Sequence, residues 1–148
     1  MMNKKLCFNI ENQYLYLEQV LVDYMGIPIF FLCKDKKQYY IALCTNIDKL
    51  SYIVTKLSLS DVYNLLHGKI PMRDVFLKQQ EYWEIVSGDE VCIDMVTKKK
   101  IDALEQSLLP EADAYFKILT KQIKLYVQEV DNEYLQQTYR LSHCSLYL

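Results

Sequence analysis

The stretch that decides the fold is DYMGIPIFFLCKDKKQYYIALC, residues 23–44. Two apolar runs, 28–33 and 38–45, flank the short polar segment DKKQ, a pattern that predicts a β-hairpin. Both runs are apolar at successive positions, which is typical of strands that are covered on both faces. We therefore expect a central hairpin in which these side chains belong to the core: Ile29, Phe31, Ile41 and Leu43.

The rest of the chain predicts further strands and short helices around this hairpin. Residues 14–22 and 50–57 are rich in β-forming residues, and 82–97 resembles a hairpin that reverses at 87–89. Ser60 and Gly68 are suited to begin and end a helix over 61–67, and Pro71 is suited to the first position of a second short helix or turn. The pattern predicts an α+β fold with an antiparallel sheet of about five or six strands.

The C-terminal third has a helical period. Apolar residues recur at 4-3-4-3-4 spacing at positions 112, 116, 119, 123, 126 and 130, which predicts one amphipathic helix over 112–140. The segment IKLYVQEV also alternates as a strand would, so a helix followed by a strand stays open. The stripe would serve either the core or contact with a second copy of the chain, and its members are Phe116, Leu119, Ile123, Tyr126 and Val130.

Length and composition limit the class of protein. The chain has 148 residues, 51% of them hydrophobic and 24% charged, with a formal net charge of -2. These values predict one globular domain over 1–148, with 112–140 as a helical extension. No window approaches the roughly 18 apolar residues of a membrane span, and the start lacks a secretory core. We therefore expect a cytoplasmic protein without a membrane partner.

Motifs for catalysis are not evident in the sequence. Three glycines are too few for a phosphate-binding loop. The five cysteines are scattered, as expected of reduced thiols. His67 stands beside a helix-ending glycine, where a structural role is expected. We therefore predict no enzyme activity, no cofactor and no metal.

Several residues are candidates for contact with a partner. Lysines flank the tip of the central hairpin, and a second lysine run occupies 98–100. Nucleic acid is an unfavoured partner because the chain is mildly acidic. Thirteen tyrosines, one tryptophan and an arginine among apolar neighbours favour a protein partner, since Tyr, Trp and Arg dominate interface hot spots. The predicted binding residues are Lys36, Lys37, Tyr39, Arg73 and Trp83.

An ordered set of short motifs resembles a family of small bacterial and phage-borne domains of unknown function. These motifs are Tyr24-x-Gly26-x-Pro28 with Phe31, Tyr39-Tyr40, Arg73-Asp74-x-Phe76, and Leu109-Pro110. The resemblance covers about residues 14–116, and it departs from the pattern at Ile27 and Met72. It implies a β-meander followed by a short helix, and it carries no catalytic residue.

Together these observations predict a non-catalytic protein-binding module. The partner would be a host or defence-system protein, and the chain would act as an inhibitor or accessory protein in phage–host conflict or bacterial defence. Three alternatives stay open at this point. They are a self-assembling structural domain such as a homodimer, a weak nucleic-acid-binding protein, and an enzyme whose site is not visible in the sequence.

Overall fold

A seven-stranded antiparallel sheet forms the body of the protein. The computed structural model describes residues 5–87 and 94–146, with side chains described through residue 140. Each strand pairs with the next one in sequence, so the sheet is a meander. The α+β prediction is confirmed, and the sheet has more strands than the five or six expected. The strands are β1 Leu6–Ile10, β2 Gln13–Tyr24, β3 Ile27–Lys34, β4 Tyr39–Asn46, β5 Ser51–Leu57, β6 Glu81–Val86 and β7 Met95–Lys100.

The central hairpin of β3 and β4 lies in the core on both faces, as expected. Side chains of a strand alternate between the faces of the sheet, and here both sets are covered. Phe30, Leu32 and Ile41 belong to a cluster on one face, while Phe31 and Ala42 belong to a cluster on the other. Each of these five side chains is buried. Two covered faces explain why the two runs are apolar at nearly every position.

The sheet curls so that its first strand covers one of these faces. The Phe8 ring on β1 lies 5.2 Å from the Tyr52 ring on β5 and 6.0 Å from the Phe31 ring. Lys98 Nζ on β7 lies 3.4 Å from Glu11 Oε1 in the turn after β1. The curl therefore encloses a second core, in which Trp83 on β6 is buried.

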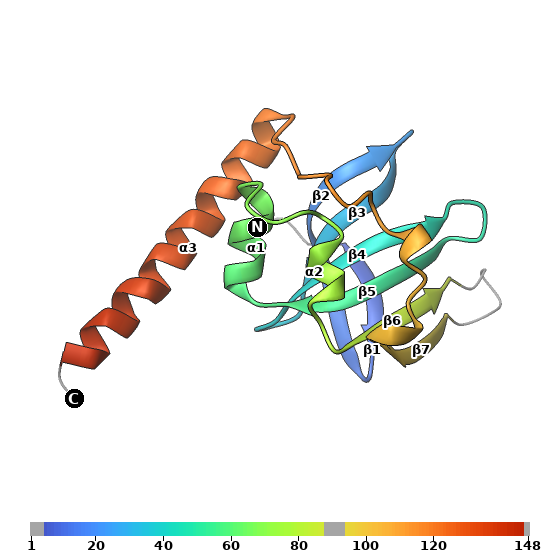
Figure 1. Cartoon of the computed structure of the whole chain (residues 1–148), viewed down its shortest axis with the longest axis horizontal. Helices are drawn as coiled ribbons and strands as arrows, with labels where there is room; N and C mark the ends of the chain where they lie inside the picture. Colours follow the sequence, from blue (N-terminus) through green and yellow to red (C-terminus); the bar gives the residue numbers. More distant parts are fainter. Residues whose placement is uncertain (1–4, 88–93, 147–148) are drawn as a thin grey trace.

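Helices cover the opposite face. Helix α1 (Leu59–Leu66) lies between the sheet and the long helix α3 (Lys121–Leu146), and α2 (Asp74–Leu77) lies over the strands (Figure 1). The 3-10 turns η1 (Ile101–Ala103) and η2 (Gln106–Leu108) belong to the segment that returns the chain to the start of α3. The far end of α3 extends past the rest of the fold (Figure 1).

Turn chemistry sets the hairpin between β2 and β3. Tyr24 pairs with Ile27, so only Met25 and Gly26 make the turn, and both have positive φ, +49° and +82°. Two successive left-handed residues match the right-handed twist of the strands that they join. Glycine adopts this conformation without the strain that a side chain adds.

Several expected boundaries were wrong. Ser58, rather than Ser60, caps α1, because its Oγ accepts a hydrogen bond from Asp61 N while the Asp61 carboxylate accepts one from Ser58 N. Pro71 begins a turn, closed by a hydrogen bond of 3.0 Å from Asp74 N to its carbonyl, and α2 follows from Asp74. Pro71 also bridges to Tyr115. Helix α3 is one continuous helix that begins nine residues later than position 112. The expected reversal at 87–89 lies partly outside the described residues.

Candidate functional site

The tip of the central hairpin carries two of the predicted binding residues. Lys36 and Lys37 are both exposed there. Asp35 holds the turn, since its Oδ1 accepts hydrogen bonds from the backbone N–H groups of Lys37 at 2.8 Å and Gln38 at 2.7 Å. Burial alone would raise the pKa of Asp35, but these two hydrogen bonds and one from Tyr40 Oη lower it. The tip is therefore a fixed turn that presents two lysines to solvent.

Tyr39, which was also predicted as a contact residue, is buried behind this tip and not exposed at it. It is only 6% exposed, and its Oη donates a hydrogen bond of 2.7 Å to Glu133 Oε2 on α3. Burial and the Glu133 carboxylate together raise the pKa of Tyr39. Lys34 Nζ lies 4.5 Å from the centre of the Tyr39 ring. Tyr39 therefore ties β4 to α3.

Trp83 and Arg73 also have structural contacts. Trp83 is 2% exposed inside the curled sheet, and Lys98 Nζ lies 5.6 Å from the centre of its ring. Of the structural and the binding role that its residue type allows, the burial of Trp83 fits the structural one. Arg73 is half-buried, and its Nη2 donates a hydrogen bond of 2.8 Å to the Gln106 carbonyl. Arg73 therefore fastens the returning segment to the start of α2.

The predicted oligomer face on the C-terminal stripe is mostly core. Of its members, Phe116, Ile123, Tyr126 and Val130 are buried in the cluster under the helices, while Leu119 is 77% exposed. Four of the five side chains are thus already used within one chain. Of the two roles expected for this stripe, these four residues have the core role, and contact with a second copy of the chain stays a prediction for Leu119.

Polar and aromatic contacts also fasten α3 to α1. His67 Nε2 lies 2.6 Å from Asp131 Oδ1, and the rings of Tyr63 and Tyr134 stack with their centres 4.2 Å apart. His67 was expected to have a structural role, and its contact joins two helices. Within the part of the chain that the structure describes, no group of three or more His, Cys, Asp or Glu is placed to hold a metal ion.

The second lysine run is largely engaged by carboxylates. Lys98 Nζ lies 3.1 Å from Glu81 Oε1, and Lys99 Nζ lies 3.0 Å from Glu84 Oε2. These pairs cross between β6 and β7, which are neighbouring strands. The run therefore supports the edge of the sheet, and its net positive field is reduced by the paired acids.

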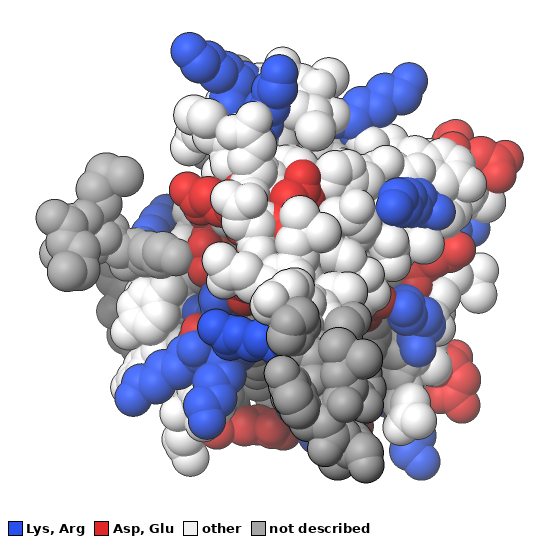
Figure 2. All heavy atoms as spheres, turned by 90° about the vertical axis from the view of Figure 1, so that its left-hand side faces the viewer, with Lys and Arg blue, Asp and Glu red and all other residues white. Residues whose placement is uncertain are grey.

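The outward side of α3 exposes large apolar side chains that sequence analysis missed. Leu125 is 53% exposed, Leu135 is 62% exposed and Tyr139 is 61% exposed. From Leu135 to Arg140 every side chain is exposed. Figure 2 shows this side of the molecule, where uncharged side chains predominate along the middle, while Lys and Arg gather at the upper edge and at the lower left. The signal in the sequence is a second apolar set out of phase with the buried stripe.

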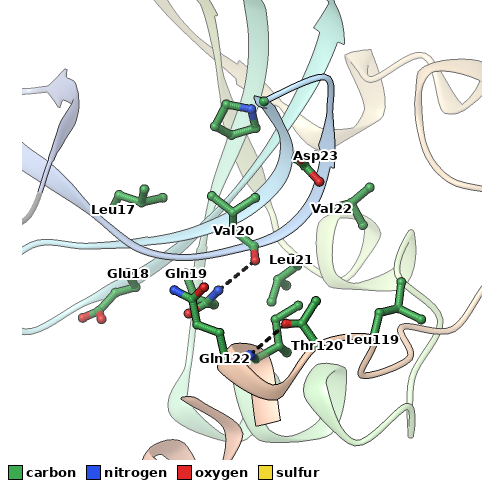
Figure 3. A pocket seen from close by; sticks show the side chains of 13 residues that line it. Leu17, Glu18, Gln19, Val20, Leu21, Val22, Asp23, Leu119, Thr120 and Gln122 are labelled. Carbon is green, nitrogen blue, oxygen red and sulfur yellow. Dashed lines mark hydrogen bonds between the residues drawn. The ribbon is translucent and has the colours of Figure 1, made fainter. Parts of the chain in front are cut away.

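A groove lies beside β2, at the start of α3 (Figure 3). Its volume is about 460 Å³. One wall is the second half of β2, from Leu17 to Asp23, and the other wall consists of Leu119, Thr120, Gln122 and Ile123. Thr120 begins α3, because its Oγ1 accepts a hydrogen bond of 3.1 Å from Ile123 N. The β-forming residues of 14–22 indicate strand β2, but no local pattern in the sequence indicates a groove beside it.

Comparisons with protein-family models, with curated proteins and with solved structures find no match to this chain. The resemblance to small bacterial and phage-borne domains therefore stays a prediction from short motifs. Among the described helices, none combines the length and the apolar character needed to cross a membrane.

Proposed function

We propose that the protein is a non-catalytic module that binds another protein through the outward side of α3. The observation that carries this proposal is the set of apolar side chains that this helix leaves in water, Leu125, Leu135 and Tyr139. Large apolar side chains that an amphipathic helix exposes on one side are typical anchors for a groove on a partner. A single exposed leucine is ordinary, but three large side chains, each more than half exposed, lie on one helix here.

The geometry of α3 supports recognition by a groove on the partner. The helix has 26 residues, which corresponds to a length of about 39 Å. Its buried stripe fastens the first half to the body, and its far end extends past the other elements (Figure 1). A partner can therefore approach the far half without displacing any core residue. An amphipathic helix that lies in an apolar groove is a recurrent mode of protein recognition.

A double substitution tests this proposal. Leu125→Glu with Leu135→Glu places two charges on the outward side, and recovery of a partner by the tagged protein from bacterial lysate should fall at least about tenfold, because each buried charge costs more than 1 kcal/mol. The matched control is Met95→Glu with Leu108→Glu, two exposed apolar positions elsewhere, at 68% and 43%. The control should recover the partner as the native chain does.

Three results would count against the proposal. They are recovery of no protein above background, equal recovery by both double variants, and a partner that both variants lose. Circular dichroism of each variant establishes that it is folded. Sedimentation of the native chain alone separates binding of a different protein from self-association, since only the latter changes its mass. The role in phage–host conflict or bacterial defence is a proposal that the identity of the recovered partner would test.

A further inference from the structure

Among the described residues, half of strand β2 has a neighbouring strand on one edge only. Strand β1 pairs with β2 only from Gln13 to Tyr16, and the last backbone bond that the described residues make to this edge from the N-terminal segment is Leu17 N to Lys5 O, at 2.7 Å. Beyond that point β2 continues to Tyr24 with β3 on one side. No strand that the structure describes lies on the other side. An unpaired edge presents a row of backbone donors and acceptors to any extended chain.

The groove lies along this open edge. Residues of β2 from Leu17 to Asp23 line it, and the start of α3 faces them (Figure 3). Its volume of about 460 Å³ lies within the usual range for ligand-binding pockets. At its edge the Val20 carbonyl accepts a hydrogen bond of 3.0 Å from the Gln19 side chain (Figure 3). A rotation of the Gln19 side chain would release this acceptor for the backbone N–H of a bound peptide.

The charge of the groove indicates what it would bind. Its thirteen lining residues include two carboxylates, Glu18 and Asp23, and no Lys or Arg. Apolar side chains make most of the remaining lining, among them Leu21, Leu119 and Ile123. A ligand that complements this surface has an extended backbone, apolar side chains and positive charge. An acidic lining opposes a nucleic acid, whose phosphates would be repelled.

A second copy of the chain fits this edge poorly. Antiparallel pairing of two β2 edges about a two-fold axis between Val20 and Leu21 would place Glu18 of one copy near Asp23 of the other, and like charges that face each other across strands are destabilising. The register of β2 against β3 also shifts between Leu17 and Gln19 and again between Val20 and Val22. These bulges bend the strand, so the added ladder is short and side chains must contribute much of the selectivity.

We propose that the open edge of β2 binds an extended basic peptide by strand addition. Its backbone pairs with β2 beyond Leu17, its apolar side chains pack against Leu21 and Ile123, and its Lys or Arg side chains approach Glu18 and Asp23. Strand addition of this kind takes its affinity from main-chain hydrogen bonds and its specificity from pockets for alternate side chains. This surface differs from the outward side of α3, so each of the two proposals can fail alone.

The test uses a fluorescein-labelled peptide of about eight residues that alternates Val and Lys, with binding measured by fluorescence anisotropy. One matched peptide replaces Lys by Glu. A second keeps every side chain but carries N-methyl groups on alternate backbone nitrogens, which removes hydrogen-bond donors. The Val–Lys peptide should bind at least about tenfold more tightly than either, since one lost charge pair or a short ladder corresponds to more than 1.4 kcal/mol.

Variants of the chain locate the site. Asp23→Lys should weaken binding of the Val–Lys peptide by about tenfold, because Asp23 is exposed at the groove and the substitution reverses its charge. Asp48→Lys makes the same charge change at an exposed turn between β4 and β5, and it should leave binding unchanged. Leu125→Glu with Leu135→Glu should also leave binding unchanged, since these positions do not line the groove.

Several results would overturn the proposal. They are no binding of the Val–Lys peptide, equal affinity for the Val–Glu peptide, equal affinity for the N-methylated peptide, and equal weakening by Asp23→Lys and Asp48→Lys. A dimer in sedimentation that Asp23→Lys alters while Asp48→Lys does not would also overturn it, because a second copy would then occupy the edge. Tighter binding of a single-stranded oligonucleotide at the same edge would assign the groove to nucleic acid instead.

Discussion

Two residues of α3 that stand two positions apart should differ sharply in their effect on stability. Ile123 is 4% exposed, whereas Leu125 is 53% exposed. Two positions on a helix are about 200° apart, so one side chain faces the body and the other faces away from it. Substitution of each by Ala therefore compares a packed position with an outward one in the same turn of the same helix.

The magnitude follows from burial. Ile123→Ala removes three buried carbon atoms, worth about 0.8 kcal/mol each in transfer free energy, and it leaves a cavity that adds to the cost. The better helix propensity of Ala returns a few tenths of a kcal/mol. We expect Ile123→Ala to lower the free energy of unfolding by about 3 kcal/mol. Leu125→Ala should change it by no more than about 0.5 kcal/mol, as surface substitutions usually do.

Urea unfolding measured with two signals provides the test. Circular dichroism at 222 nm reports the helices, and fluorescence of Trp83 reports the core inside the curled sheet, where this residue is buried. Coincident transitions would establish two-state unfolding, and an unchanged slope would assign the shift to stability. Equal losses from both substitutions, or a loss below about 1 kcal/mol for Ile123→Ala, would refute the packing of α3 that we describe.

Two further predictions concern charged and reactive groups. Burial alone would raise the pKa of Asp61, but the Lys78 ammonium and Ser58 lower it. The Asp61 carboxylate therefore stabilises the fold above the unfolded pKa of about 3.9, and this stabilisation is lost as the pH falls through the lower pKa of the folded state. Asp61→Asn should therefore lower the free energy of unfolding by about 1 kcal/mol at pH 7. Urea unfolding repeated below pH 4 should show a progressively smaller loss, and a loss that does not depend on pH would contradict this prediction. A hydrogen bond from Cys33 lowers the pKa of the Cys7 thiol, while the hydrogen bond with Cys7 and burial raise the pKa of Cys33. Iodoacetamide should therefore modify Cys7 before Cys33 in native protein, whereas peptide mapping that finds Cys33 modified equally fast would exclude this order.

The sheet was largely predictable because its signal is local. The apolar runs around residues 28–45 carry the strand pattern, and their alternation between two clusters explains why both runs are apolar at nearly every position. Strand β1 was not predicted. Only five residues form it, and its burial arises from Phe8 meeting Phe31 and Tyr52, which are distant in sequence. Contacts of this kind depend on the curl of the sheet, which no local pattern encodes.

The N-terminal cap of α1 was predictable in principle, but it was assigned two residues too late, at Ser60 instead of Ser58. The segment SLSD offers two serines, and the reciprocal capping pair requires an acidic residue three positions after the cap. Only Ser58 has such a residue, at Asp61. Thr120 gives a comparable signal for α3, since its side chain accepts from Ile123 N. The apolar spacing extended the expected helix back to 112 because Phe116 is buried in the same cluster from a non-helical segment.

Binding residues were harder to predict, because residue type does not determine exposure. Tyr39 and Trp83 have the side chains that interfaces favour, yet both are buried, since aromatic residues also dominate cores. Lys36 and Lys37 are exposed as expected, because a tight turn carries no core contact. The open edge of β2 is a property of strand pairing, and a sequence shows only that a strand forms and not where its neighbour stops.

The stripe on α3 shows how far helical periodicity can be interpreted. An apolar face at 4-3-4 spacing predicts that the face is buried, but it does not tell whether the same chain or a second one buries it. In this fold the answer comes from α1 and the sheet, which already contact Ile123, Tyr126 and Val130 in one cluster. Leu125 and Leu135 fall outside that period. Apolar residues that a helix keeps out of phase with its buried face are therefore better candidates for contact with a partner than the face itself.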